Sequence, residues 1–313
     1  MTRLHDHPLG ERMRIRATVA AVTGALALSA LAVPAAQAAG GTAQDGDYRT
    51  DAAKIARAAN DRAPGKPYDL NVTFSNFKVA KEIAVGTGAH VSRTVTYTLT
   101  HGSDVDVKSA DFLTAPYLYR GSFDAPTAVP LMGNSPATCK ATSATTAACT
   151  GKIDIYPAQD DLLNRDAGTW KGAALAIDYN GQDPEGFDFD ITKVGYADQG
   201  DLGTARVQRA SLLTVDATPE PVKKGATLTV AGKLSIANWE THKYSGYANQ
   251  SVKLQFRTKN ATSYTTVKTV KSAAGGVLKT TVKASADGYY RYSFAGNVAV
   301  PAVNAAGDLV DVQ

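Results

Sequence analysis

The chain lacks the sequence motifs that mark common enzyme classes. Of its five histidines, only His90, His101 and His242 lie beyond residue 38, and none belongs to an H-E-x-x-H motif or to a close pair. The usual ligand set of a zinc hydrolase is therefore absent. There is no G-x-S-x-G elbow, and Gly86-Thr87-Gly88 lacks the lysine and helix of a phosphate-binding loop. We therefore expect no enzymatic activity, although spacing alone does not exclude a Ser-His-Asp triad, whose members come from distant positions.

The sequence also has neither a strong charge imbalance nor a long apolar run after residue 38. Residues 39–313 contain 29 Lys and Arg against 27 Asp and Glu, a net charge of +2. A nucleic-acid partner usually requires a basic stripe, so none is expected. No later stretch approaches the ~20 apolar residues of a membrane-spanning helix, and there is no hydrophobic C-terminal anchor. We therefore expect no membrane anchor.

Residues 1–38 have the order of features found in an export signal. A basic stretch over residues 12–16 precedes an uncharged Ala/Leu/Val-rich segment over residues 17–33, and the triplet Ala36-Gln37-Ala38 follows. A signal peptidase cleaves after such a small-residue triplet. The arginines of the basic stretch are not adjacent, which speaks against a twin-arginine signal. The sequence therefore predicts a cleaved signal peptide and a secreted, extracellular protein.

The two cysteines of the chain are Cys139 and Cys149. In an exported protein, two cysteines ten residues apart most simply form a disulfide. The residues between them resemble two short strands joined by a Ser/Ala/Thr turn, so the bridge would pin a hairpin. By loop-closure reasoning it would contribute roughly 2–3 kcal/mol of stability.

Residues 39–210 contain two regions of different character. Residues 39–67 are predicted to be flexible or partly helical, because the Ala-rich stretch over 51–61 is either a marginal helix or a spacer. Strand patterns then begin, and the clearest lies over 89–100, where apolar and polar side chains alternate as in a half-buried strand. Residues 68–210 therefore predict a β-rich domain of the sandwich type, with strands over 70–74, 89–100, 117–120, 138–141, 147–155, 170–179, 187–193 and 206–213.

Residues 211–313 contain seven short strand patterns separated by turn residues at nearly even spacing. Gly275-Gly276 and Asp287-Gly288 supply tight-turn chemistry for two of the connections. This spacing is typical of a β-sandwich. The predicted strands are 212–217, 226–234, 251–257, 264–270, 277–282, 289–295 and 308–312. In the sixth strand, Tyr290, Tyr292 and Phe294 share one face, which we expect to be internal.

The segment TPEPVKKGATLTVAGKL over residues 218–234 resembles the opening of bacterial immunoglobulin-like domains. The stretches SVKLQFR (251–257) and GYYRYSFAG (288–296) resemble the same domains. The whole chain is similar to secreted two-domain actinobacterial β-proteins of undetermined role that end in such a domain. The resemblance implies an all-β fold of two sandwiches, the C-terminal one immunoglobulin-like. It also implies that this module is a spacer, an adhesion unit or a binding accessory, with no catalytic residues.

An acidic stretch over residues 178–190 is a candidate calcium site. Oxygen-bearing side chains recur around glycines, as Ca²⁺ coordination requires, but no flanking helices or twelfth-position Glu of an EF-hand are present. One alternative is a solvated acidic loop. Another is a strand in which Asp188 and Asp190 alternate with Phe187 and Phe189, so that one face is wet and the other buried. Paired carboxylates could also serve a glycosidase, which would need a cleft. The candidate metal ligands are Asp178, Asn180, Asp183, Glu185 and Asp188.

Aromatic side chains in the connection over residues 239–247 are candidate ligand contacts. Trp239, Tyr244 and Tyr247 could stack on the apolar faces of sugar rings. Alternatively, Trp239 plugs one end of a sandwich and the tyrosines pack along its flank, as aromatics in small β-domains mostly do.

The sequence as a whole favours a secreted, non-enzymatic binding or structural module that acts through surface loops. Its partner would be a cell-wall polymer or another extracellular protein. Two alternatives remain open: a calcium-binding extracellular protein, and an accessory of a carbohydrate-active or cell-wall-acting enzyme. An enzyme would require a cleft in which a histidine meets a carboxylate at hydrogen-bond distance.

Overall fold

The structure is a computed structural model that describes residues 48–60 and 65–313. The predicted signal peptide, residues 1–38, lies outside the described residues, as do residues 39–47 and 61–64 of the predicted N-terminal segment. Among the described helices, none combines the length and the apolar character needed to cross a membrane.

The described chain begins with helix α1, Tyr48–Asn60. Its alanine content favours a helix. Asp51 in the first turn and Arg57 in the last turn interact favourably with the helix dipole. Such a short helix is marginal in water by itself. It is retained here because it buries Ala52 and Ile55 against a sheet. Of the two alternatives that the sequence left open for this stretch, the structure therefore has the helix.

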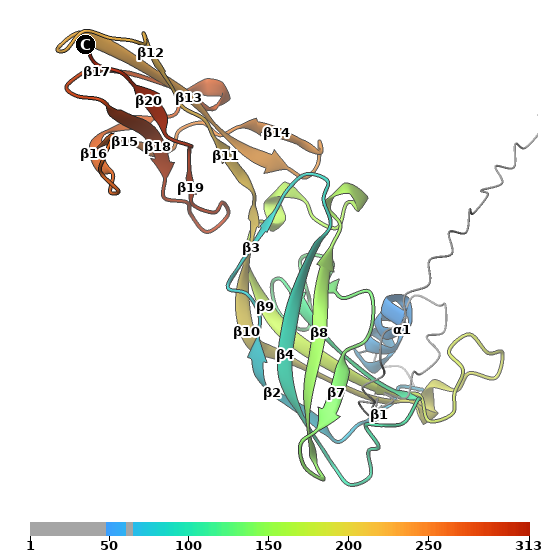
Figure 1. The fold of residues 1–313 in the computed structure, drawn as a ribbon. Helices are drawn as coiled ribbons and strands as arrows, with labels where there is room; N and C mark the ends of the chain where they lie inside the picture. The colour runs from blue at the N-terminus through green and yellow to red at the C-terminus, as the bar shows by residue number, and fades with distance from the viewer. Residues whose placement is uncertain (1–47, 61–64) are drawn as a thin grey trace, which may run out of the picture. The chain divides into compact units, whose positions relative to one another are not determined.

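Two sheets form the N-terminal sandwich (Figure 1). One has the strand order β1-β10-β9-β5-β6, with β3 added parallel to β10, and the other has the order β2-β4-β8-β7. The 3₁₀ turns η1 (Pro157–Gln159) and η2 (Asn164–Asp166) lie in the connection from β8 of one sheet to β9 of the other, whereas η3 (Ile191–Lys193) lies between β9 and β10 of the same sheet. The strands are β1 (Tyr68–Asp69), β2 (Val72–Lys78), β3 (Glu82–Val85), β4 (Val91–His101), β5 (Phe112–Tyr119), β6 (Leu131–Met132), β7 (Thr138–Ala141), β8 (Thr146–Ile155), β9 (Gly168–Asp178) and β10 (Gly195–Arg209).

The alternation predicted for the strand near residues 89–100 is confirmed in β4. Val95, Tyr97 and Leu99 are buried, whereas the threonines between them are exposed or half-buried. The buried side chains pack with Trp170 of β9 in the core between the two sheets. Because successive strand residues point to opposite faces, one face of β4 builds this core and the other faces water.

The sheet that contains β5 and β9 is buried on both faces. Residues 172–177 of β9 are all buried, and so are residues 114–119 of β5. One face of this sheet contributes to the core of the sandwich, whereas Ala115, Leu175 and Ile177 on the other face pack with helix α1. Continuous burial replaces the alternation that identifies a half-buried strand. The sequence prediction therefore found only the end of β5, at residues 117–120.

The prediction of a strand over residues 187–193 is wrong. These residues form turns followed by the 3₁₀ turn η3, in which the Asp190 carboxylate accepts the Thr192 backbone N–H at 3.1 Å. Phe187, expected on a buried strand face, is fully exposed. Asp side chains that bond their own backbone compete with the sheet ladder, and this favours the turn.

The C-terminal sandwich also has two sheets. Strand β13 pairs with β11, β12, β14 and β17, and the facing sheet has the order β16-β15-β18-β19 with β20 on β18. Tyr290, Tyr292 and Phe294 of β18 are buried on one face, as predicted. The elements are β11 (Ser211–Leu213), β12 (Asp216–Thr218), β13 (Thr227–Asn238), β14 (Lys243–Gly246), β15 (Ser251–Thr258), β16 (Thr265–Lys271), η4 (Ala274–Gly276), β17 (Val277–Lys283), β18 (Gly288–Phe294), β19 (Val303–Asn304) and β20 (Asp308–Val310).

Trp239, which follows β13, does not belong to the core of its own sandwich. Its side chain is fully buried within the core cluster of the N-terminal sandwich. The indole Nε1–H donates to the Val85 carbonyl at 3.2 Å, and the Trp239 backbone N–H donates to the Asn164 side chain at 3.0 Å. The expectation that Trp239 either contacts a ligand or plugs its own domain is therefore corrected, because the ring is enclosed by the other sandwich.

Candidate binding site beneath helix α1

A pocket of about 670 Å³ lies between helix α1 and the strands β5, β9 and β10. Ala52 and Ala56 of the helix line it, and these small side chains leave space that larger residues would fill. The volume falls within the roughly 300–1,000 Å³ typical of small-molecule sites. The sheet side of the pocket is lined by Tyr117, Tyr119, Leu175, Tyr196 and Asp198.

A half-buried carboxylate, Asp198, forms part of this wall. It comes two residues after Tyr196 on β10, so the two side chains share one face of the strand. The Tyr117 hydroxyl donates to the two carboxylate oxygens at 2.7 and 2.9 Å, and the Tyr196 hydroxyl donates at 2.8 Å. Two phenol donors thus hold one carboxylate in the wall of the pocket.

Burial raises the pKa of Asp198 from 3.8 to about 6, although the hydrogen bonds from Tyr117 and Tyr196 oppose that rise. Burial, together with the nearby carboxylate, raises the pKa of both tyrosines, so they remain protonated donors. A perturbed carboxylate in a pocket is a common feature of functional sites.

A polar arrangement at Tyr119 extends this wall. The Tyr119 hydroxyl donates to Asp201 at 3.1 Å, and Lys171 forms an ion pair with the same carboxylate at 2.7 Å. Phe123 packs edge-on against the Tyr119 ring, with 5.4 Å between the ring centroids. The pocket therefore combines aromatic surface with hydrogen-bonding groups.

A second polar cluster is centred on Asp154, which also lines the pocket. His90 Nε2 lies 2.9 Å from the Asp154 carboxylate, and the His90 ring stacks on Tyr156 with 4.3 Å between centroids. The Asn134 backbone N–H donates to the same carboxylate at 2.9 Å. Burial alone would raise the pKa of Asp154, but hydrogen bonds from Ser92, Asn134 and His90 outweigh it and lower the pKa.

The Asp154 cluster meets one requirement of an enzyme but lacks the order of a catalytic triad. In a triad the histidine lies between the carboxylate and the nucleophile, and it removes the proton of the hydroxyl. Here Ser92 and His90 both bond to Asp154, so the carboxylate lies between them. The other two histidines lie elsewhere: His101 Nδ1 is 2.8 Å from the Gly102 carbonyl, and His242 is 3.5 Å from Asp160.

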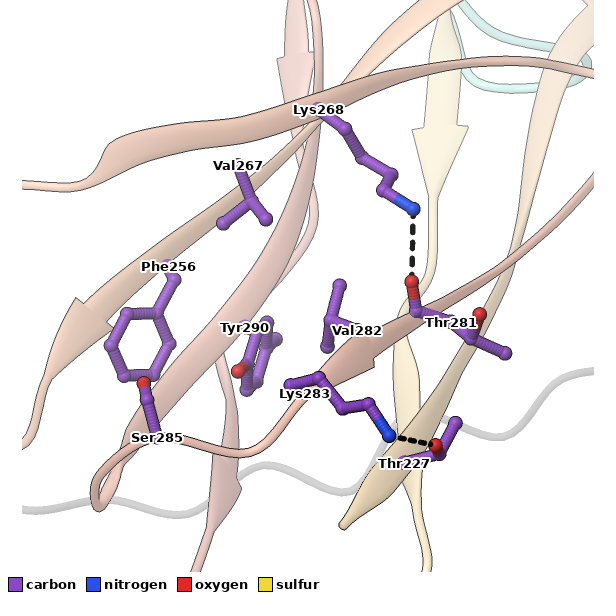
Figure 2. A pocket seen from close by; sticks show the side chains of 9 residues that line it. All are labelled: Thr227, Phe256, Val267, Lys268, Thr281, Val282, Lys283, Ser285 and Tyr290. Atoms are coloured by element: carbon purple, nitrogen blue, oxygen red, sulfur yellow. Dashed lines mark hydrogen bonds between the residues drawn. The ribbon is translucent and has the colours of Figure 1, made fainter. Parts of the chain in front are cut away.

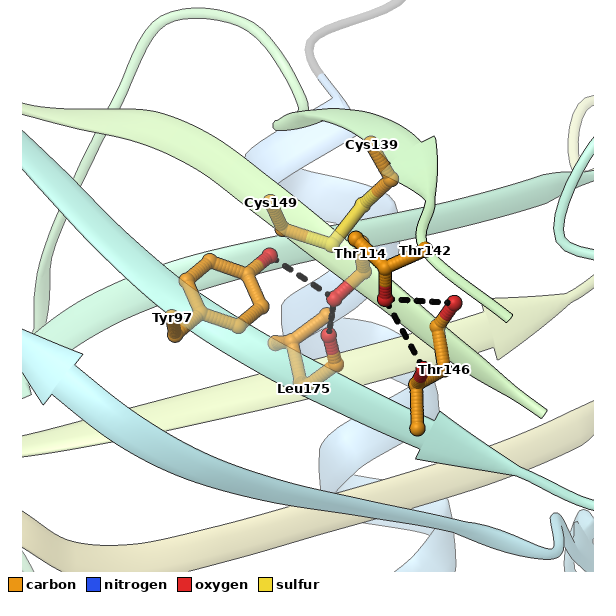
Figure 3. Close-up of a disulfide and its surroundings, with 7 residues drawn as sticks. All are labelled: Tyr97, Thr114, Cys139, Thr142, Thr146, Cys149 and Leu175. Carbon is orange, nitrogen blue, oxygen red and sulfur yellow. Dashed lines mark hydrogen bonds between the residues drawn. A yellow bond between two sulfur atoms is a disulfide. The ribbon is translucent and has the colours of Figure 1, made fainter.

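The disulfide Cys139–Cys149 is confirmed and joins β7 to β8 (Figure 3). Cys149 is buried in the core, where it lies opposite Tyr97 in the β4–β8 ladder. The Tyr97 hydroxyl and the Thr114 hydroxyl are 3.0 Å apart, and Thr114 donates to the Leu175 carbonyl at 2.6 Å. The bridge thus fixes the short strand β7 to the sheet that faces β5 and β9.

Replacing both cysteines with serine is expected to lower the free energy of unfolding by about 2–3 kcal/mol, because a closed loop of about ten residues loses its constraint in the unfolded chain. Urea unfolding of oxidised wild type and of Cys139→Ser/Cys149→Ser measures the difference. Adding a reductant to the wild type should reproduce the shift, whereas the variant should not respond. Equal stability of the two oxidised proteins would contradict the structural role.

Residues 78–176 match a protein family described only as a family of unknown function, DUF5707. The matched segment runs from the end of β2 into β9, so it covers most of the N-terminal sandwich. No curated protein matches the chain in sequence.

Among solved structures, the chain resembles proteins built from immunoglobulin-like domains, at low similarity. A three-domain titin fragment, I67–I69, is 10% identical with a TM-score of 0.29, over 78% of this chain and 66% of that one. The mouse nectin-like molecule 4 ectodomain is 13% identical (TM-score 0.22; 78% and 65%), and the Escherichia coli adhesin FdeC is 12% identical (TM-score 0.27; 77% and 64%). The chain thus spans slightly less than two thirds of each of these structures. Similarity at this level carries no conclusion about function.

The five residues predicted to bind calcium lie on the loop between β9 and η3 and at its start. The Asp178 carboxylate accepts the Asn180 backbone N–H at 3.1 Å, and the Asp183 carboxylate accepts the Glu185 backbone N–H at 3.0 Å. Asp188 is exposed on the same loop. Within residues 48–60 and 65–313, no three Asp, Glu, His or Cys side chains are grouped as metal ligands. Calcium binding stays a prediction.

The three predicted aromatic contacts have different environments. Trp239 is enclosed, as described above. Tyr244 on β14 is 38% exposed. Tyr247 packs edge-on against Phe294, and its hydroxyl accepts a hydrogen bond from the Asn297 side chain at 3.0 Å. The three rings therefore do not form one shared platform.

Sequence reasoning missed the residues that line the pocket. Tyr117 and Tyr196 were not distinguished from other strand aromatics, and Asp198 was not singled out. A signal was present in Tyr196-Ala197-Asp198, because an acidic residue two positions from a tyrosine in a strand shares its face. That signal identifies a pair, whereas the third member, Tyr117, is about 80 residues away.

Proposed function

We propose that this protein is an exported, non-enzymatic binding module, and that the pocket beneath helix α1 takes its ligand. The observation that carries the proposal is the half-buried Asp198 carboxylate, held by two tyrosine hydroxyls in the wall of a pocket of about 670 Å³. Largely pre-formed pockets with a few placed polar groups are typical of ligand sites. The arrangement around Asp154 lacks an activated nucleophile, which favours binding over catalysis.

The lining favours a saccharide segment of an extracellular polymer. Tyr117 and Phe123 present aromatic surface, which suits the apolar C–H face of a sugar ring. Lys54 and Asn60 on the helix side supply donors, and Asp198 supplies an acceptor for hydroxyl groups. We propose the cell-wall polymer expected from the sequence as the ligand of this pocket.

Filling the pocket tests the proposal. Ala56 of α1 lines the pocket and is half-buried, so Ala56→Leu places a larger side chain in the space while keeping a strong helix former. Residues 39–313 of wild type are expected to co-sediment with purified bacterial peptidoglycan, and Ala56→Leu is expected to weaken that binding at least about tenfold.

Ala58→Leu is the matched control, because Ala58 lies on the same helix and does not line the pocket. It should bind as wild type does. Circular dichroism and thermal melts of all three proteins separate lost binding from lost folding. If wild type fails to bind peptidoglycan, or if both leucine variants bind equally well, the proposal is wrong.

A further inference from the structure

The C-terminal sandwich has a pocket of about 400 Å³ between two edge strands (Figure 2). Among the described strands, β16 pairs only with β15 and β17 only with β13, so each leaves one edge unpaired there. Phe256, Val282 and Tyr290 provide its apolar surface, and Val267, which is 45% exposed, lies at its side. Apolar side chains therefore line a pocket between two unpaired strand edges, which proteins usually protect from contact with other chains.

Lysine side chains border this pocket without acidic partners. Lys268 Nζ donates to the Thr281 carbonyl at 2.9 Å, and Lys283 Nζ donates to the Thr227 hydroxyl at 2.9 Å (Figure 2). Both lysines are exposed, and throughout the described chain neither forms an ion pair. Their positive charge is therefore available to an incoming acidic group.

The N-terminal sandwich carries a loop with complementary features. Phe187 is the most exposed large apolar side chain of the described residues. Glu185 and Asp188, both exposed, lie on either side of it in the sequence, and Asp183 precedes them. A fully exposed phenylalanine side chain is unfavourable in water, so its burial at a contact would be favourable. The acidic residues beside Phe187 are complementary in charge to the lysines that border the apolar pocket.

We propose that these two surfaces bind each other between copies of this chain: Phe187 of one copy enters the pocket between β16 and β17 of a second copy. The charges of the two halves support the pairing. Residues 211–313 contain twelve Lys and Arg against six Asp and Glu, whereas residues 39–210 contain 17 against 21. Full exposure of Phe187 means that it does not occupy the pocket of its own chain.

The contact is heterologous, because two different surfaces meet. Such a contact leaves one free loop and one free pocket on every pair, so copies can add in sequence to form a chain or a closed ring. A single aromatic side chain in a small pocket gives a weak contact, with a dissociation constant of about 10 μM to 1 mM. This association between copies does not depend on ligand binding beneath α1.

Sedimentation velocity of residues 39–313 at protein concentrations up to about 1 mM tests the proposal over the range expected for the contact. We expect reversible association in wild type and association at least about tenfold weaker in Phe187→Ala. Val298→Ala is the matched control, because Val298 is a loop residue 54% exposed and lies outside both surfaces. It should associate as wild type does. A wild type that stays monomeric throughout, or a Phe187→Ala variant that associates normally, would overturn the proposal.

A charge exchange checks the partner surfaces directly. Lys268→Glu/Lys283→Glu and Glu185→Lys/Asp188→Lys should each fail to self-associate, because like charges then meet at the contact. Mixed in equal amounts, the two variants should associate in alternation, because the loop of each variant then meets an oppositely charged pocket on the other. Failure of the mixture to associate, with both variants folded by circular dichroism, would also overturn the proposal. Peptidoglycan binding measured on the same variants reports separately on the pocket beneath α1.

Discussion

Replacing Trp239 with alanine is expected to lower the free energy of unfolding of the N-terminal sandwich by about 3–5 kcal/mol, the usual cost of truncating a fully buried tryptophan. The residue belongs in sequence to the C-terminal domain. Its indole ring nevertheless fills part of the N-terminal core and donates to the Val85 carbonyl. Truncation would leave a cavity and would remove one of the two hydrogen bonds that the Val85 carbonyl accepts, the other coming from the Ala210 backbone N–H at 2.8 Å.

The chain offers a direct readout of this effect. Trp170 and Trp239 are its only tryptophans, and Trp170 is fully buried in the N-terminal core. In Trp239→Ala the fluorescence therefore reports on the N-terminal sandwich alone during urea unfolding. Tyr244→Ala, which truncates a partly exposed aromatic from the same connection, should cost less than about 1 kcal/mol. A Trp239→Ala loss that small would contradict the structural role.

The contacts around Trp239 also predict that the two sandwiches do not unfold independently. The Asn164 side chain donates to Asn238 and Glu240, both at 2.8 Å, and the Gln208 side chain donates to the Asn297 carbonyl at 2.8 Å. Buried side chains and several hydrogen bonds thus join residues of both domains. A domain boundary at residue 210 therefore separates the strands of the two sandwiches, but side chains from beyond residue 210 still pack into the N-terminal core.

The strand pattern of this protein could be predicted wherever one face of a strand meets water. Apolar and polar residues alternate along β4 and β18 for that reason, and both strands could be predicted from this pattern. It failed for β5, which is covered on both faces, and for residues 187–193, where local side-chain bonds of Asp190 favour a turn. An alternating sequence pattern identifies a strand only when one of its faces is buried and the other is exposed. Strand β5 is buried on both faces, and residues 187–193 form no strand.

The candidate site was beyond sequence reasoning for a different reason. Its pocket arises because small alanines of α1 face tyrosines of two strands that are far away in the chain. No pattern within a short stretch of sequence predicts that the helix and these two strands come together. Trp239 illustrates the same limit, because its sequence neighbours suggest a surface connection, whereas its ring lies in the core of another domain. By contrast, the disulfide depended only on cysteine number, spacing and compartment, and the structure confirms it.

Asp198 is expected to give wild type a stability that decreases as the pH rises from about 4 to above 6. Burial raises the pKa of this carboxyl from 3.8 in the unfolded chain to about 6 in the folded one. In that interval the folded state binds more protons than the unfolded state, so raising the pH favours unfolding. A shift of about two units corresponds to about 3 kcal/mol, which we reduce to about 1–3 kcal/mol because the residue is only half-buried.

The measurement compares wild type with Asp198→Asn, which keeps the shape of the protonated carboxyl and removes its titration. The stability of wild type relative to this variant, from urea unfolding at pH 4 to 8, should fall by that amount and level off above pH 7.

Asp201→Asn is a control of opposite sign, because the hydrogen bond from Lys171, together with one from Tyr119, lowers the pKa of Asp201. Asparagine also tolerates the positive φ of 55° at this position. Relative to that variant, wild type should lose stability as the pH falls. A flat difference between wild type and Asp198→Asn would mean that the Asp198 carboxylate is well solvated, and the pocket would then lose its buried anchor.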